Sequence, residues 1–307
     1  MPDGTIDAHM HVIGPFDRFP LAPTAQYKPF AAPWQEQKEI LIGKMGFWGF
    51  VRAQARLHRM ALAPSARAAL RRPAAIADQP KVGRPSLRGG KENAEVGAQN
   101  DAKDAAEGGA QSSANDGAAA RLLEFTLETL AERIGRGPLP GLAAALERLR
   151  RRAAEFRDAS PSFLHLDYHP QNVLVKGPRV TGVVDWAHAA IGDRHFDAAT
   201  TALILSTSAM EHPRWMRDNP AGNNLRRTFN ALYLALYHAS APMDLRRLRY
   251  YQGLAGALRL SMLGMMRMRG PQSVGLRAGA ISEVTPSVLR LLTGYVARKT
   301  GAAVSIP

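Results

Sequence analysis

Residues 163–185 interrupt a largely helical sequence with short β-forming runs. Two of these runs, NVLV and VTGVV, are separated by the turn signal KGP, which predicts a β-hairpin. Because a hairpin brings the ends of its strands together, Asn172 and Asp185 are expected to meet at its open end. Asp167 lies in the loop that leads into the first strand. The pattern therefore predicts three oxygen-bearing side chains near one end of a rigid hairpin.

These three side chains suit the chemistry of phosphoryl transfer. Mg²⁺ prefers oxygen ligands and is usually held by one or two carboxylates together with substrate phosphates. Asn172 and Asp185 could supply such ligands, while Asp167 is placed to accept the proton of a hydroxyl or to orient that hydroxyl. A single Asp at a hairpin end is more often a cap or a turn former, so the hypothesis depends on the spacing of all three residues.

The same block resembles the catalytic core of the aminoglycoside phosphotransferase and choline kinase-like enzymes, which share the protein-kinase-like fold. The similarity is carried by three stretches: His165-x-Asp167-x-His169-x-x-Asn172, Val184-Asp185-Trp186 and Gly192-Asp193-x-x-x-Asp197. Residues 53–58 also resemble the family's LARLH helix. The resemblance runs from about residue 40 to residue 307, with 61–120 poorly matched.

The resemblance implies a role for each residue of the site. Asp167 would be the catalytic base, His165 a structural member of the catalytic loop, and His169 a residue that lines the site. Asn172 and Asp185 would be the metal ligands, which hold Mg²⁺ and with it the cofactor ATP. The implied activity is the transfer of the ATP γ-phosphate to a hydroxyl of a small molecule.

Other residues of the block are expected to be structural. Asp197 would support the catalytic loop by hydrogen bonds, and Trp186 would pack beneath the site. Taken without the resemblance, Asp193 and Asp197 are each as consistent with a functional role as with a structural one. His58 and His188 lack the support of the coupled spacing, so they are predicted to be surface or packed histidines.

The charge of the chain bears on its partners. The balance of 40 Lys and Arg against 26 Asp and Glu favours anionic partners such as nucleotides. The Arg residues are scattered along helical patterns without aromatic motifs, which argues against a nucleic-acid partner. Residues 201–307 hold 14 basic and 4 acidic residues, which favours a neutral or anionic acceptor over a polycationic aminoglycoside. No signal core or membrane span is visible, so we expect a cytoplasmic protein without a membrane partner.

The N-terminal residues resemble a different family. Residues 5–33 are similar to the start of an amidohydrolase-related barrel of the 2-pyrone-4,6-dicarboxylate lactonase type. His9 and His11 form an HxH pair, a metal-ligand arrangement at the end of a strand. Such a barrel needs about 250 residues and eight strands, and the rest of the chain offers no such series. A metal-dependent hydrolase is therefore the least favoured hypothesis.

We expect four segments: an amidohydrolase-like fragment (1–33), the helical start of a kinase-like C-lobe (34–85), a disordered linker (86–118) and the phosphotransferase catalytic C-lobe (119–307). The linker lacks aromatic residues, so it cannot offset an ordering entropy of about 1–2 kcal/mol per residue. Apolar periodicity predicts helices over these ranges: 34–60, 123–134, 142–156, 198–210, 225–238, 245–268 and 286–300.

The predicted fold class is α+β: a protein-kinase-like, mainly helical C-lobe with a small catalytic hairpin. The N-lobe is expected to be missing or truncated, because only about 40 residues precede the LARLH-like helix and they hold no strand–Gly loop–strand pattern. A degenerate, non-catalytic pseudo-phosphotransferase from a fused or truncated reading frame is therefore the alternative function.

Overall fold

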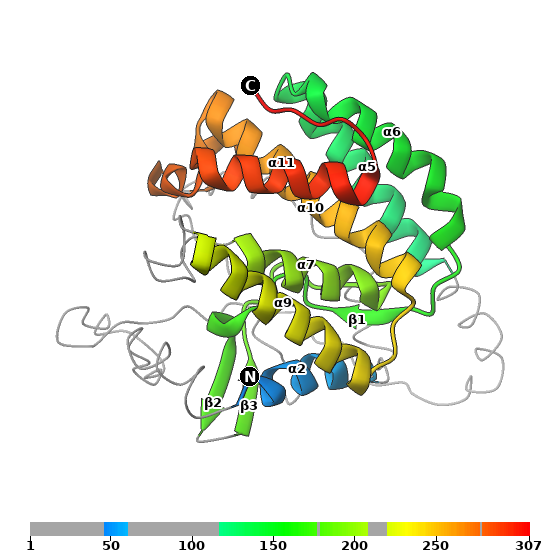
Figure 1. Ribbon diagram of the computed structural model, residues 1–307. Coiled ribbons are helices and arrows are strands. Elements are labelled where there is room, and N and C mark those ends of the chain that lie inside the picture. Colours follow the sequence, from blue (N-terminus) through cyan, green and yellow to red (C-terminus); the bar gives the residue numbers. More distant parts are fainter. Residues whose placement is uncertain (1–45, 61–116, 177–178, 208–219, 277) are drawn as a thin grey trace, which may run out of the picture.

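The computed structural model describes residues 46–60, 117–176, 179–207, 220–276 and 278–307. Seven α-helices are described (Figure 1): α2 (Gly46–Leu57), α5 (Ala118–Arg136), α6 (Ala143–Arg152), α7 (Arg194–Thr207), α9 (Pro220–Ser240), α10 (Leu245–Arg269) and α11 (Pro286–Thr300). The strands are β1 (Ser162–Leu164), β2 (Val173–Lys176), β3 (Arg179–Val183) and β4 (Ala190–Gly192). Short 3-10 helices cover Pro140–Leu142, Ala153–Phe156, Pro170–Asn172, Pro271–Val274 and Ala278–Glu283. None of these helices is long and apolar enough to cross a lipid bilayer.

Several predictions concern residues outside this part of the chain. They include the amidohydrolase-like fragment with His9 and His11, and most of the predicted linker. Ala118, the last residue of that linker, is the first residue of α5. The expected absence of a nucleotide-binding sheet before the LARLH-like helix also falls mainly on residues 1–45, which are not described. Within the described residues the fold is mainly helical with a small hairpin, as predicted, and it has a second two-stranded sheet that was not predicted.

The helices form where the sequence predicted them, with shifted ends. α11 begins at Pro286 as expected, and the Thr285 side chain caps it by accepting the N–H of Val288 at 3.2 Å. α7 begins at Arg194, four residues before the predicted start at 198. The reason is a cap that the prediction missed, because Asp193 accepts the N–H of His195 at 2.9 Å.

The centre of the domain is α10, a helix of 25 residues that is buried along most of its length. It packs against α7, α11, α5 and α6. Close approach of α11 depends on Gly256, where a Cβ atom would lie only 3.0 Å from the side chains of Tyr295 and Val296. α2 and α9 lie together on the other side of α7 (Figure 1).

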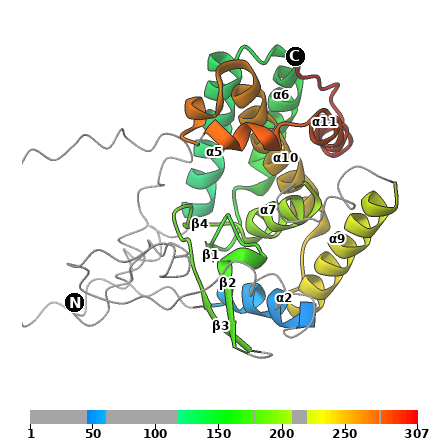
Figure 2. The ribbon, with the colours of Figure 1, turned by 90° about the vertical axis from the view of Figure 1, so that its left-hand side faces the viewer.

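The two sheets are antiparallel pairs that bring two loops together. β2 and β3 form the predicted hairpin, with Val173 opposite Val183. β1 pairs with β4, with Ser162 opposite Gly192; β4 was not predicted, because three residues give little local signal. The hairpin stands beside α2 (Figure 2). The loop after β1 and the loop after β3 both leave from this region, and together they carry the predicted site.

Candidate active site

The carboxylate of Asp197 on α7 lies beneath the predicted site and is fully buried. Its Oδ1 accepts the backbone N–H of Leu166 at 2.6 Å, and its Oδ2 accepts that of His165 at 3.2 Å. Both N–H groups belong to the loop after β1. Asp197 therefore supports this loop by hydrogen bonds, as the sequence predicted, and it has no exposed surface with which to touch a substrate.

α2 and the residue that follows it supply the other partners of Asp197. The Nε2 atom of His58 lies 2.7 Å from Oδ2, and the Nε2 group of Gln54 donates to the same oxygen at 3.3 Å. Gln54 is itself held by Thr201 at 2.9 Å and by Tyr233 at 2.6 Å. His58 is therefore a packed histidine, as predicted. Burial alone would raise the pKa of Asp197, but the hydrogen bond and charge of His58 outweigh it, so the pKa lies below its usual range.

The loop that Asp197 supports has a strained backbone. Leu166 has a φ of +60°, in the left-handed region, where a bulky residue loses about 1–2 kcal/mol. The short bond from its N–H to Asp197 holds this conformation in place. The next residue, Asp167, has a side chain that is 32% exposed. A buried carboxylate thus stabilises the turn that brings Asp167 to the surface.

The side chain of His165 holds the loop after β1 in place by hydrogen bonds to the backbone. It is fully buried, its Nε2 donates to the carbonyl of Val184 at 2.9 Å, and its Nδ1 accepts the N–H of Asp167 at 3.3 Å. Burial lowers its pKa, and a neutral ring with one donor and one acceptor fits this pattern. The ring packs on Trp186, with centroids 4.5 Å apart, so Trp186 lies beneath the site as predicted. His165 is therefore a positioning residue.

Asn172 joins Asp167 from the start of the hairpin. Its Nδ2 donates to the backbone carbonyl of Asp167 at 2.9 Å and to Oδ2 at 3.3 Å. Because the amide hydrogens of Asn172 face Asp167, the amide oxygen Oδ1 is left for another partner. His169 lies on the other side, with Nε2 3.6 Å from Asp167 Oδ2. The sequence placed these three residues in one site, and the structure brings them together.

The electrostatics of Asp167 follow from these neighbours. Burial on its own would raise the pKa of the carboxyl group. The His169 imidazole, followed by the charge of His188, outweighs burial, so the pKa lies below its usual value. Asp167 is therefore an ionised carboxylate at neutral pH, and it can accept a hydrogen bond from a hydroxyl group.

Asp185 follows the last paired residue at the open end of the hairpin. The N–H of Val184 donates to the carbonyl of Asn172 at 2.9 Å, which places Asp185 one residue beyond that bond. The backbone of the hairpin thus closes as predicted. Asp185 is exposed and has a φ of +62°, a conformation that Asp tolerates better than most residues.

Asn172 and Asp185 have the chemistry of magnesium ligands, since both offer hard oxygen atoms. In the described part of the chain, no three His, Cys, Asp or Glu side chains converge as a metal cluster.

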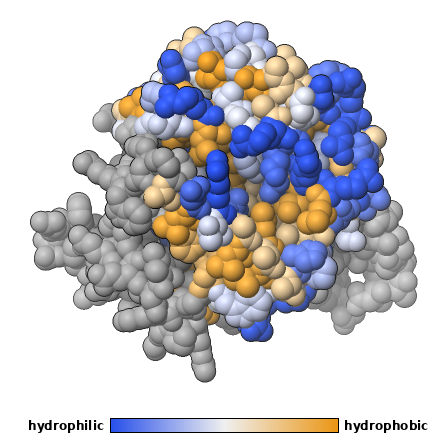
Figure 3. Space-filling model, viewed as in Figure 1, coloured by the Kyte–Doolittle hydropathy of each residue, from blue (hydrophilic) through white to orange (hydrophobic). Residues whose placement is uncertain are grey.

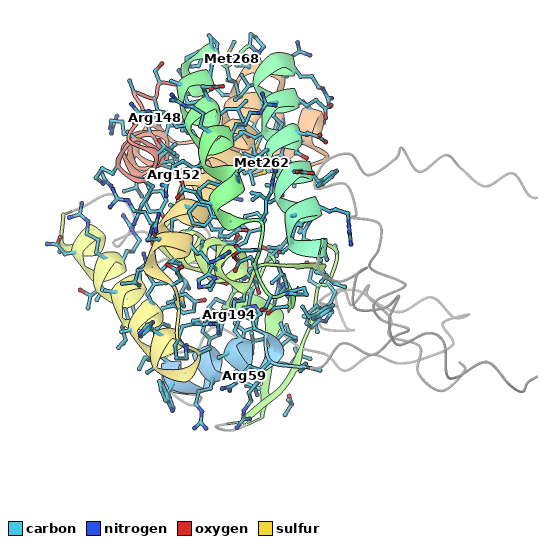
Figure 4. All side chains as sticks on the ribbon, turned by 90° about the vertical axis from the view of Figure 1, so that its right-hand side faces the viewer. Arg59, Arg148, Arg152, Arg194, Met262 and Met268 are labelled. Atoms are coloured by element: carbon cyan, nitrogen blue, oxygen red, sulfur yellow. The ribbon has the colours of Figure 1, made fainter. Side chains whose placement is uncertain are left out.

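A cavity of about 170 Å³ opens beside Asp167. Its walls are mainly apolar side chains of α7 and α10, among them Leu203, Leu258 and Met262, the last of which is labelled in Figure 4. Its polar groups are those of Asp167, His188, Thr200, Thr207, Arg133 and Arg259. No pattern in the sequence predicted this cavity, because α5, α7 and α10 come together only in the fold.

The prediction that His188 is a surface or packed histidine is incomplete. His188 is exposed, as a surface histidine would be, but it also lines the cavity together with Asp167. Its position three residues after Asp185 was the one feature of the sequence that could have indicated a place near the site. Asp193 is structural, because it caps α7 and pairs with Arg247 at 3.3 Å.

Comparisons with known proteins found a matching family and a similar solved structure. Residues 49–243 match the phosphotransferase enzyme family. A crystal structure of a protein from Ralstonia eutropha JMP134, described as a candidate aminoglycoside phosphotransferase, has 13% sequence identity and a TM-score of 0.50. The match covers 86% of this chain and 68% of that chain, and at this identity it shows the fold alone, which is protein-kinase-like. No curated protein sequence matches.

Proposed function

Because the chain belongs to the phosphotransferase enzyme family, we propose that it transfers the γ-phosphate of ATP to a hydroxyl of a small molecule. The observation that carries the proposal is the hydrogen-bonded pair of Asp167 and Asn172, beside a cavity large enough for part of an acceptor. Phosphoryl transfer needs mainly positioning and charge stabilisation from the protein. A loop fixed by Asp197 and His165 supports such positioning.

In this proposal Asp167 receives the acceptor hydroxyl. Its ionised carboxylate accepts the hydrogen bond of that hydroxyl and takes the proton as the hydroxyl oxygen bonds to the γ-phosphorus. The bond between the γ-phosphorus and the bridging oxygen breaks in the same transfer, and ADP leaves with that oxygen. A carboxylate with a pKa below its usual value is a weak base, which suits a loose transition state in which the attacking oxygen has gained little bonding. The main contribution of Asp167 is therefore to orient the hydroxyl.

Asn172 and Asp185 would hold Mg²⁺ with the phosphates of ATP. The fit is supported by the donor set, an amide oxygen turned away from Asp167 and an exposed carboxylate. When bound, the ion would neutralise charge on the phosphates. Asn172 would also keep Asp167 in position, so one side chain would connect the nucleotide and acceptor sides of the site.

The cavity beside Asp167 indicates the class of acceptor. Its walls are mainly apolar, and the charged residues that line it besides Asp167 are Arg133 and Arg259. A polycationic aminoglycoside would meet like charge there, whereas a neutral or anionic alcohol with an apolar body would not. The preferred acceptor is therefore a hydroxyl compound of the second kind.

Transfer from γ-labelled ATP to a panel of alcohols tests this function. We expect phosphorylation of neutral or anionic alicyclic and aromatic alcohols in preference to aminoglycosides. Asp167→Asn should lower kcat strongly while nucleotide binding persists, and the exposed variant Glu128→Gln is the matched control of equal charge change. ATP binding with no transfer to any acceptor, or transfer that Asp167→Asn leaves intact, would favour the degenerate pseudo-phosphotransferase.

A further inference from the structure

A second cavity, of about 250 Å³, lies where the end of α7 meets α9 and α11. Thr207 lines both this cavity and the one beside Asp167. The face of the molecule between α11 and α9 carries a band of hydrophilic residues (Figure 3). None of the residues assigned to phosphoryl transfer lines this second cavity, so it needs its own explanation.

The side chains around this cavity are rich in positive charge. Arg227, Arg298 and Lys299 line it, and the described lining residues include no carboxylate. Burial lowers the pKa of Lys299, and the charges of Arg249 and Arg298 lower it further. Lys299 Nζ lies 5.6 Å from the centre of the Tyr295 ring. A bound anion would offset the repulsion among these cations.

Two polar atoms at the same cavity have unmet hydrogen-bonding capacity. Tyr295 Oη and Asn230 Oδ1 are both buried and find no hydrogen-bond partner within the described part of the chain. Burial raises the pKa of Tyr295, so its hydroxyl keeps its proton and can donate. Asn230 Oδ1 can only accept. The pair is therefore complementary to a ligand that has both an acceptor and a donor.

We propose that this cavity is a second small-molecule site, which binds a compound carrying a phosphate or carboxylate group and a neighbouring hydroxyl. Arg298 and Lys299 contact the anionic group, Tyr295 donates to it, and Asn230 accepts from the hydroxyl. None of these four residues lines the cavity beside Asp167, and the proposal does not depend on the proposed function.

Calorimetric titration of the full chain tests the proposal with three probes. Glycerol 3-phosphate carries a phosphate and hydroxyls, glycerate carries a carboxylate and hydroxyls, and methyl phosphate lacks the hydroxyl. We expect glycerol 3-phosphate or glycerate to bind, the tighter of the two identifying the anion. Methyl phosphate should bind more weakly than glycerol 3-phosphate, because Asn230 Oδ1 then gains no donor.

Paired variants identify the place of binding. Arg298→Gln with Lys299→Gln should weaken binding at least tenfold, whereas Arg150→Gln with Arg151→Gln on the exposed face of α6 removes equal charge and should leave it within twofold. Tyr295→Phe should weaken binding about threefold to tenfold without lowering the melting temperature of the free protein, because the hydroxyl it removes has no partner in the described structure.

The variant Asp185→Asn, at the proposed nucleotide site, should leave the binding of these probes unchanged. The proposal is overturned if no probe binds at millimolar concentration, or if the α6 pair weakens binding as much as the α11 pair. It is also overturned if Tyr295→Phe has no effect on the dissociation constant, or if Asp185→Asn abolishes binding.

Discussion

Replacement of Asp197 by Ala should destabilise the fold and disorganise the loop that carries Asp167. The substitution leaves the N–H groups of Leu166 and His165 buried without an acceptor, at a cost of about 1–3 kcal/mol each. It also removes the carboxylate that His58 Nε2 contacts at 2.7 Å, and a buried polar group left without its partner costs a further amount of about 1–3 kcal/mol. Because these costs overlap, we expect a loss of about 3–5 kcal/mol in the free energy of unfolding.

Urea denaturation followed by tryptophan fluorescence measures this loss, with Asp197→Asn as the milder variant. The Asn side chain keeps one oxygen for Leu166, so its loss should be about 1.5–3 kcal/mol. Asp158→Ala is the control, because that exposed carboxylate pairs with Arg247 at the surface and should matter far less.

The effect of Asp197 should also depend on pH in a defined direction. Its pKa is lower in the folded protein than in the unfolded chain, where an Asp titrates near about 3.9. The stabilisation is therefore present above that value and is lost as the pH falls through the folded pKa. A loss below about 1 kcal/mol in the free energy of unfolding for Asp197→Ala would refute this explanation of the loop. So would a difference in stability between the wild-type chain and Asp197→Asn that does not shrink below about pH 4.

Three further predictions concern the site. Asp185→Gly should keep or raise the melting temperature, because Gly adopts a φ of +62° without the cost of up to about 1 kcal/mol that a residue with a Cβ atom bears. The same variant should lose its stabilisation by MgATP, and scanning fluorimetry with and without the nucleotide measures both effects. His188→Ala should raise KM for the acceptor and leave that for ATP unchanged, because His188 lines the cavity; equal changes in both KM values would contradict its placement. His169→Ala should raise the pKa of Asp167 and move the acid limb of the kcat/KM profile to higher pH, since protonation of Asp167 stops the reaction as the pH falls. An unmoved limb would exclude His169 as the group that lowers the pKa of Asp167.

Local signals explain what could be predicted from the sequence. The two β-rich runs on either side of the KGP sequence predicted the hairpin, and Thr285 with Pro286 predicted the start of α11. The spacing of Asp167, Asn172 and Asp185 predicted that a loop and a hairpin end would meet. Each of these features depends on residues close together in the chain, so a pattern is enough to recognise it.

Contacts between distant residues account for what could not be predicted. His58 and Asp197 are 139 residues apart in the chain, and nothing in either neighbourhood identifies Gln54 or Tyr233 as further members of their network. The cavity beside Asp167 likewise needs side chains from three helices. Its Arg133 belongs to a helix whose apolar stripe indicated only a core face.

The binding of MgATP is the most direct test of the claim that Asn172 and Asp185 form a nucleotide site. At a ligand concentration of 100 times Kd, binding stabilises the folded state by about 2.7 kcal/mol, which raises the melting temperature by about 5–10 °C for a domain of this size. We expect this shift for the wild-type chain and for Glu128→Gln, and no shift for Asp185→Asn. No shift of the wild-type chain at millimolar MgATP, or an equal shift of all three proteins, would contradict it.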